Sequence, residues 1–178
     1  MLARAEREAS RLADLAARIE RGEVTPEELG ARTSRAAAAA RAPAPRLPYR
    51  RYRTSGGLEV RVGRGSAAND ELTFHHSSPD DIWMHARDVG GAHVVLRWTD
   101  RDANPPAADL AEAASLAALH SRARTSRTVP VDWTRRKYVR KPRKAKPGLV
   151  MVERAKTIFV QPSNVLEKRL REEDERGW

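Results

Sequence analysis

The feature that most constrains the fold is a basic segment, residues 121–147, that carries too much charge to be buried. It contains eleven lysines or arginines and one acidic residue, Asp132, so its net charge is +10. The whole chain also carries +10, from 34 basic and 24 acidic residues, so the remainder is neutral overall. Because unpaired charges are rarely buried, this segment must follow the surface of the domain. Such a concentration favours a polyanionic partner, with nucleic acid ahead of an anionic surface.

Length and composition narrow the class of protein. A chain of 178 residues is long enough for one domain and an appendage, but too short for two full cores. It contains no cysteine, which excludes disulfides and thiolate metal sites. No window holds 18 uncharged apolar residues, and the first letters, MLARAEREAS, carry charge where a signal peptide needs an apolar stretch. We therefore expect a cytoplasmic protein with no membrane partner.

The first 41 residues are predicted to form a short helical hairpin. Apolar residues spaced by three and four run from Leu2 to Ile19, and Arg21-Gly22 supplies a helix stop. Thr25 is expected to cap a second helix that continues to Ala40. The alanine-rich seam is thin, so the hairpin is expected to pack on the main domain, on a protein partner or on a second copy. Residues 42–48 are predicted to be a proline-rich linker.

The segment 49–162 has the pattern of a strand-rich domain with helices. Glycine and proline divide it into short runs of β-branched and aromatic residues. Strands are predicted over residues 49–53, 58–62, 82–87, 92–98, 128–141, 149–152 and 158–160. Helices are predicted over residues 67–75 and after Asn104, which is expected to cap the second one. The predicted fold class is α+β, a mostly antiparallel sheet with one or two packed helices, with a polar C-terminal helix or tail over residues 163–178.

The basic segment combines aromatic rings with cations. In a continuous strand, alternate residues share a face, so Val131 and Trp133 are expected to point inward and Asp132 and Thr134 outward. The same alternation puts Arg136, Tyr138 and Arg140 on the outer face, where a ring between two guanidiniums could grip phosphates and stack on a base. In the alternative, Tyr138 is a core residue and the cations form a rim. The RNA-contact residues predicted from charge and position are Arg64, Arg122, Arg124, Arg135, Arg136, Tyr138, Arg140, Lys141, Arg143, Lys144 and Lys146.

The sequence offers little support for catalysis. It has no G-x-S-x-G elbow and no histidine pair at HxxxH spacing. His85 and His93 lie on neighbouring predicted strands and could converge with Asp88 and Asp70, so a metal-dependent enzyme is one alternative, although hydrogen-bonded structural histidines are commoner. A DNA or anionic-surface binder using the same basic residues is another. We predict no enzyme activity, no cofactor and no resident metal.

Several motifs together resemble a known family. The stretches GRGSAANDELTF, DDIWMHARDVGGAHVVL, AASLAALHSRARTSRTVPVDWTRRKYVRKP and AKPGLVMVERAKTIFVQP resemble the NFACT RNA-binding domain, the C-terminal module of ribosome-quality-control factors that add tails to stalled nascent chains. The resemblance covers residues 49–162. The residues that match the family motif include Asn69, Asp70, Trp83, His85, Asp88, His93 and Asp132.

The resemblance implies a small α+β domain that engages tRNA or large-subunit rRNA, with the large ribosomal subunit as a partner. Gly90 stands where the family usually has proline, and Trp133 where it usually has tyrosine. Arg143-Lys144 replaces a small residue and a glycine, which adds charge to that loop. The large N-terminal domain of the full-length factors has no counterpart in this sequence. The expectation is therefore a stand-alone RNA-binding module without tail synthesis. An adaptor whose N-terminal hairpin recruits a protein partner is a further alternative.

Overall fold

A computed structural model describes residues 17–18, 21–22 and 47–176 of the chain. The chain divides into two units, residues 1–46 and 47–178. In the first unit Ala17 and Arg18 are helical, and Arg21-Gly22 forms a turn in which the Arg21 N–H donates to the Ala17 carbonyl. The predicted helix stop lies at this turn. The rest of the predicted helical hairpin and the predicted linker up to residue 46 lie outside the described residues.

In the second unit, six short strands form one antiparallel sheet in the order β1-β2-β4-β3-β5-β8. Their bounds are Tyr49–Arg53 (β1), Glu59–Gly63 (β2), Ile82–Ala86 (β3), Val94–Leu96 (β4), Val129–Arg135 (β5) and Lys156–Val160 (β8). A separate two-stranded hairpin pairs Val139–Arg140 (β6) with Met151–Val152 (β7). The predicted α+β fold with a mostly antiparallel sheet is therefore confirmed.

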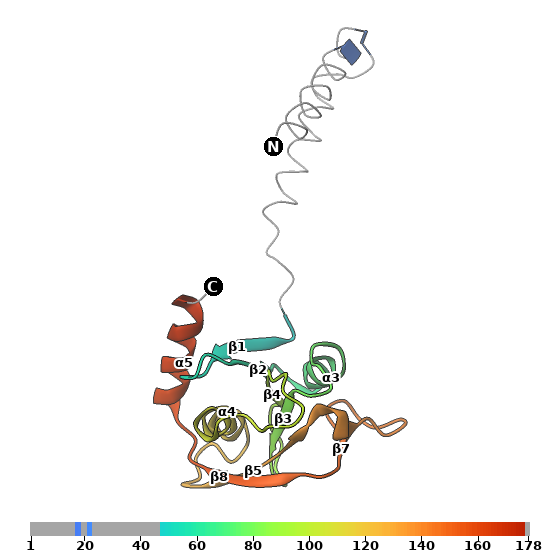
Figure 1. Cartoon of the computed structure of the whole chain (residues 1–178). Helices are drawn as coiled ribbons and strands as arrows, with labels where there is room; N and C mark the ends of the chain where they lie inside the picture. Colours follow the sequence, from blue (N-terminus) through green and yellow to red (C-terminus); the bar gives the residue numbers. More distant parts are fainter. Residues whose placement is uncertain (1–16, 19–20, 23–46, 177–178) are drawn as a thin grey trace. The chain divides into compact units, whose positions relative to one another are not determined.

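Helices cover both faces of the sheet (Figure 1). The helix α3 spans Ser66–His75, α4 spans Ala107–Leu119 and α5 spans Asn164–Arg176. α4 and α5 pack on one face together with most of the apolar side chains, whereas α3 and the β6–β7 hairpin cover the opposite face. The predicted polar C-terminal segment is thus a helix, and its Leu170 is fully buried against the domain. No helix in the described ranges has both the length and the apolar character needed to cross a membrane.

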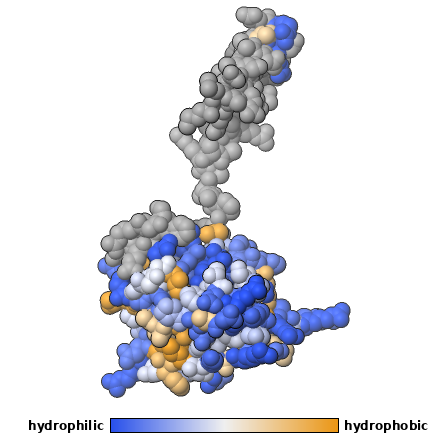
Figure 2. All heavy atoms as spheres, in the orientation of Figure 1, coloured by the Kyte–Doolittle hydropathy of each residue, from blue (hydrophilic) through white to orange (hydrophobic). Residues whose placement is uncertain are grey.

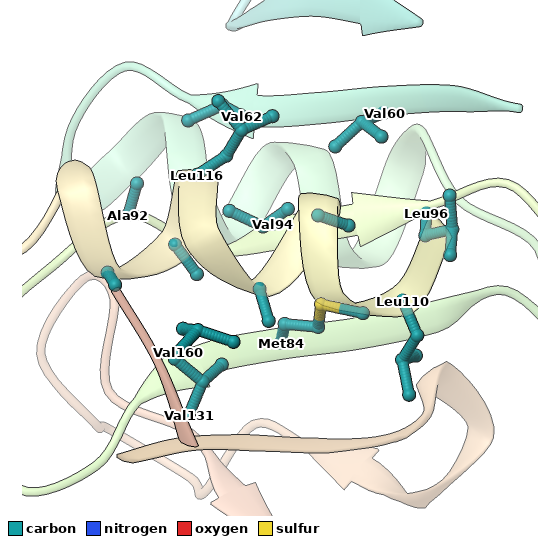
Figure 3. Close-up of a cluster of buried hydrophobic side chains, with 14 of the residues drawn as sticks. Val60, Val62, Met84, Ala92, Val94, Leu96, Leu110, Leu116, Val131 and Val160 are labelled. Carbon is teal, nitrogen blue, oxygen red and sulfur yellow. The ribbon is translucent and has the colours of Figure 1, made fainter. Parts of the chain in front are cut away.

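The main core lies between α4 and the sheet (Figure 3). Alternate residues of β3, namely Ile82, Met84 and Ala86, point into this core and are completely buried. Because the side-chain period of a strand is two, Trp83 and His85 must point to the opposite face. The hydrophobic alternation of β3 therefore fixes which side of the sheet carries the motif histidine and tryptophan.

The opposite face has a smaller apolar cluster, in which Leu72 of α3 packs with Trp83. Asn69 fastens α3 to the sheet, because its Oδ1 accepts from the His93 N–H at 3.0 Å and its Nδ2 donates to the Gly91 carbonyl at 3.1 Å. Gly63 makes this approach possible, since a Cβ at that position would lie 2.1 Å from Asn69 Oδ1.

Two predicted features of local structure are wrong. α4 begins at Ala107 with Pro106 as its N-cap, so Asn104 does not cap it. Pro106 has φ −52° and ψ 140°, a non-helical conformation. In addition, a residue that precedes a proline rarely adopts the helical conformation, which applies to both Asn104 and Pro105.

The predicted strand 128–141 is also interrupted, by a 3-10 turn at Arg136–Tyr138. There the N–H groups of Arg136 and Lys137 donate to the carbonyls of Asp81 and Pro79 instead of continuing the ladder. The predicted alternation beyond Arg135 therefore does not hold. Before that point, Val131 and Trp133 do face the main core as predicted. Thr134 points away from them but is buried, not outward, because its hydroxyl donates to the Glu153 carbonyl at 3.0 Å.

Candidate nucleic-acid interface

Lys141 anchors the basic loop, which we define as residues 142–149. Its ammonium donates to Asp70 Oδ2 at 2.8 Å, to the Lys146 carbonyl at 2.6 Å and to the Leu149 carbonyl at 3.0 Å. An ammonium has three N–H donors, so all of them are used within the protein. These contacts favour a scaffolding role for Lys141 over the phosphate contact predicted from its charge.

The basic loop is held against α3 and the sheet by its backbone. Gly148 has a φ of 81°, a backbone conformation that residues with a side chain rarely adopt. A Cβ at this position would lie 3.3 Å from the Ser66 Cα at the start of α3. The Gly148 carbonyl also accepts a hydrogen bond from His93 Nε2 at 3.2 Å. Lys144 has a φ of 61°, in the left-handed region. The common glycine that the family resemblance places at this position suits that backbone conformation.

The cations of the basic loop, Arg143, Lys144 and Lys146, are all exposed and make no side-chain hydrogen bond or ion pair within the described part of the chain. Arg140 adds a fourth cation, with a side chain that is 71% exposed and a Glu153 carboxylate 3.8 Å away. Such an exposed pair contributes little and is readily exchanged for another anion. The loop before β7 projects from the domain in Figure 1, and hydrophilic side chains cover the same projection in Figure 2. These four cations form an exposed group at the basic loop and the strand that leads into it.

By contrast, Arg135 and Arg136 are half-buried and bonded within the fold. The Arg136 guanidinium donates to the Thr73 carbonyl at 2.7 Å and to the Phe74 carbonyl at 3.3 Å, so it satisfies the C-terminal end of α3. Arg135 donates to four backbone carbonyls, those of Asp80, Asp100, Arg101 and Ala103. These contacts favour a structural role for both arginines over the RNA contact predicted from their charge and position.

Three further predicted contacts, Arg64, Arg122 and Arg124, are exposed on loops that follow β2 and α4. Arg64 Nε donates to the Tyr49 carbonyl at 3.3 Å. Arg64 also lies two residues before Ser66, which touches Gly148, so it is near the basic loop. No described contact joins Arg122 or Arg124 to that loop.

Tyr138 lies at the base of the β6–β7 hairpin, where the Glu153 N–H donates to its carbonyl at 3.0 Å. The Arg154 guanidinium lies over the ring, 4.6 Å from its centroid, and Arg154 Nη1 donates to the Tyr138 hydroxyl at 3.0 Å. Because the 3-10 turn ends the alternation, the predicted stack of Arg136, Tyr138 and Arg140 on one strand face is wrong. The half-buried ring is not a core residue either.

Five of the seven motif residues line one cleft of about 170 Å³ on the α3 side of the sheet. They are Trp83, His85, Asp88, His93 and Asp132. The Trp83 and His85 rings are stacked, with centroids 5.9 Å apart, and the His93 ring stands edge-on 5.5 Å from His85. Gly148 and Leu149 form part of the opposite wall, so the cleft and the basic loop are adjacent.

Both histidines of this cleft are held neutral. Burial, together with the neighbouring His85, lowers the pKa of His93 to about 4. Since His93 Nε2 must donate to the Gly148 carbonyl, Nδ1 is unprotonated and accepts from the Thr73 hydroxyl at 2.9 Å. Burial also lowers the pKa of His85, partly opposed by a backbone hydrogen bond with Gly91.

The remaining motif residues are also engaged. Asp132 accepts hydrogen bonds from Arg87 Nε at 3.0 Å and from Thr157 Oγ1 at 2.8 Å, and this carboxylate raises the pKa of Arg87. Asp70 holds Lys141, and its other oxygen, Oδ1, is buried without a hydrogen-bond partner.

The rings of His85 and His93 do converge across their neighbouring strands, as the metal hypothesis required. However, both ring nitrogens of His93 are bonded to protein groups, and Asp70 is bonded to Lys141. Within the described residues no group of three or more His, Asp or Glu side chains could hold a metal ion. The contacts therefore give no support to a metal-dependent enzyme at this cleft.

Residues 48–154 match the sequence pattern described as the NFACT protein RNA binding domain. The chain belongs to this family. It is similar to the Rqc2 homolog RqcH of Bacillus subtilis (strain 168), with 40% identity over 111 residues, which is 62% of this chain and 19% of that protein. It is also similar to the Rqc2 homolog RqcH of Streptococcus suis (strain 05ZYH33), with 40% identity over 116 residues, which is 65% of this chain and 20% of that protein. The chain thus spans about a fifth of the length of these relatives.

A solved structure supports the same relationship. The C-terminal part of the fibronectin/fibrinogen-binding protein from Streptococcus suis superposes with a TM-score of 0.65 at 36% identity, covering 71% of this chain and 50% of that one. The resemblance read from the sequence motifs is therefore confirmed. Within this NFACT RNA-binding domain, five motif residues line a cleft beside the basic loop. The predicted cations fall into an exposed set and a set bonded internally.

Arg101, Arg154 and Lys156 were not among the residues predicted to contact RNA. They surround Trp133 and Tyr138, and Lys156 Nζ lies 5.3 Å from the centroid of the Trp133 ring. Lys156 faces Trp133 because β5 and β8 pair in that register. The charges of these residues were visible in the sequence, but placing them beside the aromatic rings required the strand pairing.

The left-handed backbone conformation of Lys144, with a φ of 61°, predicts that glycine at this position would stabilise the domain. Lys144→Gly should raise the free energy of unfolding by about 1 kcal/mol, because glycine adopts a φ near 61° without strain. If Lys144 contacts an RNA phosphate, the same change should also weaken binding to all RNAs alike. Urea unfolding and RNA titrations check the two effects. Lys168→Gln, an exposed charge loss on α5, is the matched control and should change neither. A loss of affinity for one RNA alone would contradict a phosphate contact.

Proposed function

We propose that this NFACT RNA-binding domain binds RNA by placing the basic loop and Arg140 against the phosphate backbone. The proposed process is ribosome-associated quality control or a related step of translation in the cytoplasm, and the proposed targets are tRNA or large-subunit rRNA on the large ribosomal subunit. The role proposed is binding, without catalysis. Membership of the family and the similarity to RqcH proteins support this proposal.

The observation that carries the proposal is the contrast among the cations of the basic segment. The Lys141 ammonium donates its hydrogen bonds to Asp70 and to the loop backbone. The loop cations Arg143, Lys144 and Lys146, in contrast, are exposed and have no side-chain partner in the described structure. A loop held in this way presents positive charge with little further loss of chain entropy on binding. The bonded cations therefore build the scaffold, and the exposed ones are suited to phosphate contacts.

Salt dependence tests this proposal. If Arg140, Arg143, Lys144 and Lys146 each neutralise one phosphate, the logarithm of the affinity should fall against the logarithm of salt concentration with a slope of about −3 to −4. The triple variant Arg143→Gln, Lys144→Gly and Lys146→Gln should reduce the magnitude of that slope by about 2 to 3. Titrations of labelled tRNA and rRNA fragments at salt concentrations between about 50 and 200 mM measure the slope. A flat response, or no binding at low salt, would overturn the proposal.

Competition distinguishes RNA from other polyanions. tRNA, duplex DNA and acidic liposomes are each added to the complex with labelled RNA. RNA should displace the label at the lowest phosphate concentration, whereas equal displacement by DNA or liposomes would indicate a general anion-binding surface. Co-sedimentation with ribosomal subunits tests the proposed large-subunit partner. Removing residues 1–46 in the same assay tests whether that unit recruits a protein partner, as the sequence pattern suggests.

A further inference from the structure

A second positively charged site lies at the end of the β6–β7 hairpin opposite the basic loop. It is a groove of about 260 Å³. We call it the aromatic groove and define it by two rings and four cations, Trp133, Tyr138, Arg101, Lys137, Arg154 and Lys156. Arg140, on β6, lies between the aromatic groove and the basic loop along the hairpin. The hairpin therefore connects two basic sites through an exposed cation.

The aromatic rings of this groove are placed to receive a planar ligand. Trp133 packs one side against the main core but remains partly exposed, and its indole N–H has no acceptor among the described residues. The Arg154 guanidinium lies over the Tyr138 ring, 4.6 Å from its centroid. A guanidinium on an aromatic ring offers a flat, charged platform on which bases stack.

The charge of the groove is only partly neutralised. Asp80 pairs with Lys137 at 2.7 Å and with Arg101 at 3.2 Å, and the hydrogen bond from Lys137 holds the pKa of Asp80 below its usual range. Arg154 and Lys156 have no carboxylate partner within the described part of the chain. The aromatic groove is therefore net positive beside its rings.

The backbone of Arg154 gives an independent indication. Its φ is 53°, in the left-handed region, where a residue with a side chain costs about 1 kcal/mol. This conformation places the guanidinium over Tyr138. Strained residues of this kind persist where the surrounding structure fixes them, and they concentrate at ligand sites.

We infer that the aromatic groove binds a nucleobase of single-stranded RNA, which stacks on Trp133 and on the Arg154–Tyr138 pair while Lys156 contacts a neighbouring phosphate. This inference rests on the proposed function, because the basic loop would hold the same strand further along the hairpin. An acidic peptide would use the cations but has no need of two partly exposed aromatic rings, so the combination of rings and cations favours RNA.

The test compares two probes of equal charge, a single-stranded oligouridylate and an abasic oligomer of the same length. Tyr138→Ala should weaken binding of the oligouridylate about fivefold or more, and should leave binding of the abasic oligomer unchanged. Tyr138→Phe keeps the ring and is the matched control, with affinity close to that of the parent protein. Because the ring is half-buried, the melting temperature of each variant is measured alongside. In the parent protein the Trp133 indole N–H resonance should shift with oligouridylate and not with the abasic oligomer.

The outcomes separate this inference from the proposed function. Base-dependent binding that is lost in Tyr138→Ala and retained in Tyr138→Phe, with the Trp133 shift, supports the inference. Equal loss for both probes, or an unmoved Trp133 resonance while the oligouridylate binds, overturns it and leaves phosphate binding by the basic loop intact. If the parent protein binds neither probe at low salt, the proposed function fails, and the inference fails with it.

Discussion

Lys141→Met should lower the free energy of unfolding by about 2 kcal/mol and reduce RNA affinity several-fold, although Lys141 itself is not proposed to touch RNA. The substitution removes three charge-assisted hydrogen bonds, to Asp70 and to the Lys146 and Leu149 carbonyls. It leaves Asp70 with one oxygen that is already buried without a partner and another that has lost its cation. The basic loop then loses the contact that joins its two ends, so ordering it on RNA costs additional chain entropy.

The matched control is Lys146→Met, the same chemical change five residues away. The Lys146 side chain is exposed and has no bond within the described structure, so its removal should change stability by less than about 0.5 kcal/mol while still weakening RNA binding. A double variant, Asp70→Asn with Lys141→Met, should regain part of the lost stability because no unpaired carboxylate remains. Urea unfolding at fixed pH measures all of them. Identical midpoints for Lys141→Met and Lys146→Met would show that Lys141 does not anchor the loop.

The elements that could be predicted from sequence depend on local signals. The strand over residues 49–53 has the predicted bounds, and α3 begins at Ser66, one residue before its predicted start. The chain turns between the paired strands β1 and β2 at Ser55-Gly56-Gly57, where a φ of 86° at Gly57 suits glycine. Turn residues and side-chain periodicity act over a few positions, so the sequence contains the information needed to place these elements.

The uses of the individual cations could not be predicted in the same way, because their partners are distant in the chain. Lys141 meets Asp70 across 71 positions, and Arg136 meets the Thr73 carbonyl across 63. Nothing in the stretch TRRKYVR, residues 134–140, indicates the 3-10 turn. The turn forms where the carbonyls of residues 79 and 81 accept hydrogen bonds from Lys137 and Arg136. Net charge located the basic segment. Only the tertiary contacts separate the cations that stabilise the fold from those that remain exposed.

Acidification should destabilise the domain through His93, by about 2 kcal/mol between pH 7 and pH 5. Burial lowers the pKa of His93 to about 4, whereas a histidine in an unfolded chain titrates near 6.5. Between these two values the unfolded state binds a proton that the folded state does not, so stability falls as the pH falls through this window. The full effect at pH 4 approaches about 3 kcal/mol. The lowered pKa of His85 acts in the same direction.

His93→Gln separates this effect from that of the carboxylates, which also titrate in acid. Glutamine retains hydrogen-bonding groups that could reach the Gly148 carbonyl and the Thr73 hydroxyl, but it does not titrate. The variant should be less stable than the parent at pH 7 and should lose about 2 kcal/mol less than the parent on going to pH 5. Urea midpoints at pH 7, 6 and 5 give the comparison. If both proteins lose stability equally across this range, His93 is not held neutral in the folded protein, and its Nδ1 cannot be the acceptor of the Thr73 hydroxyl.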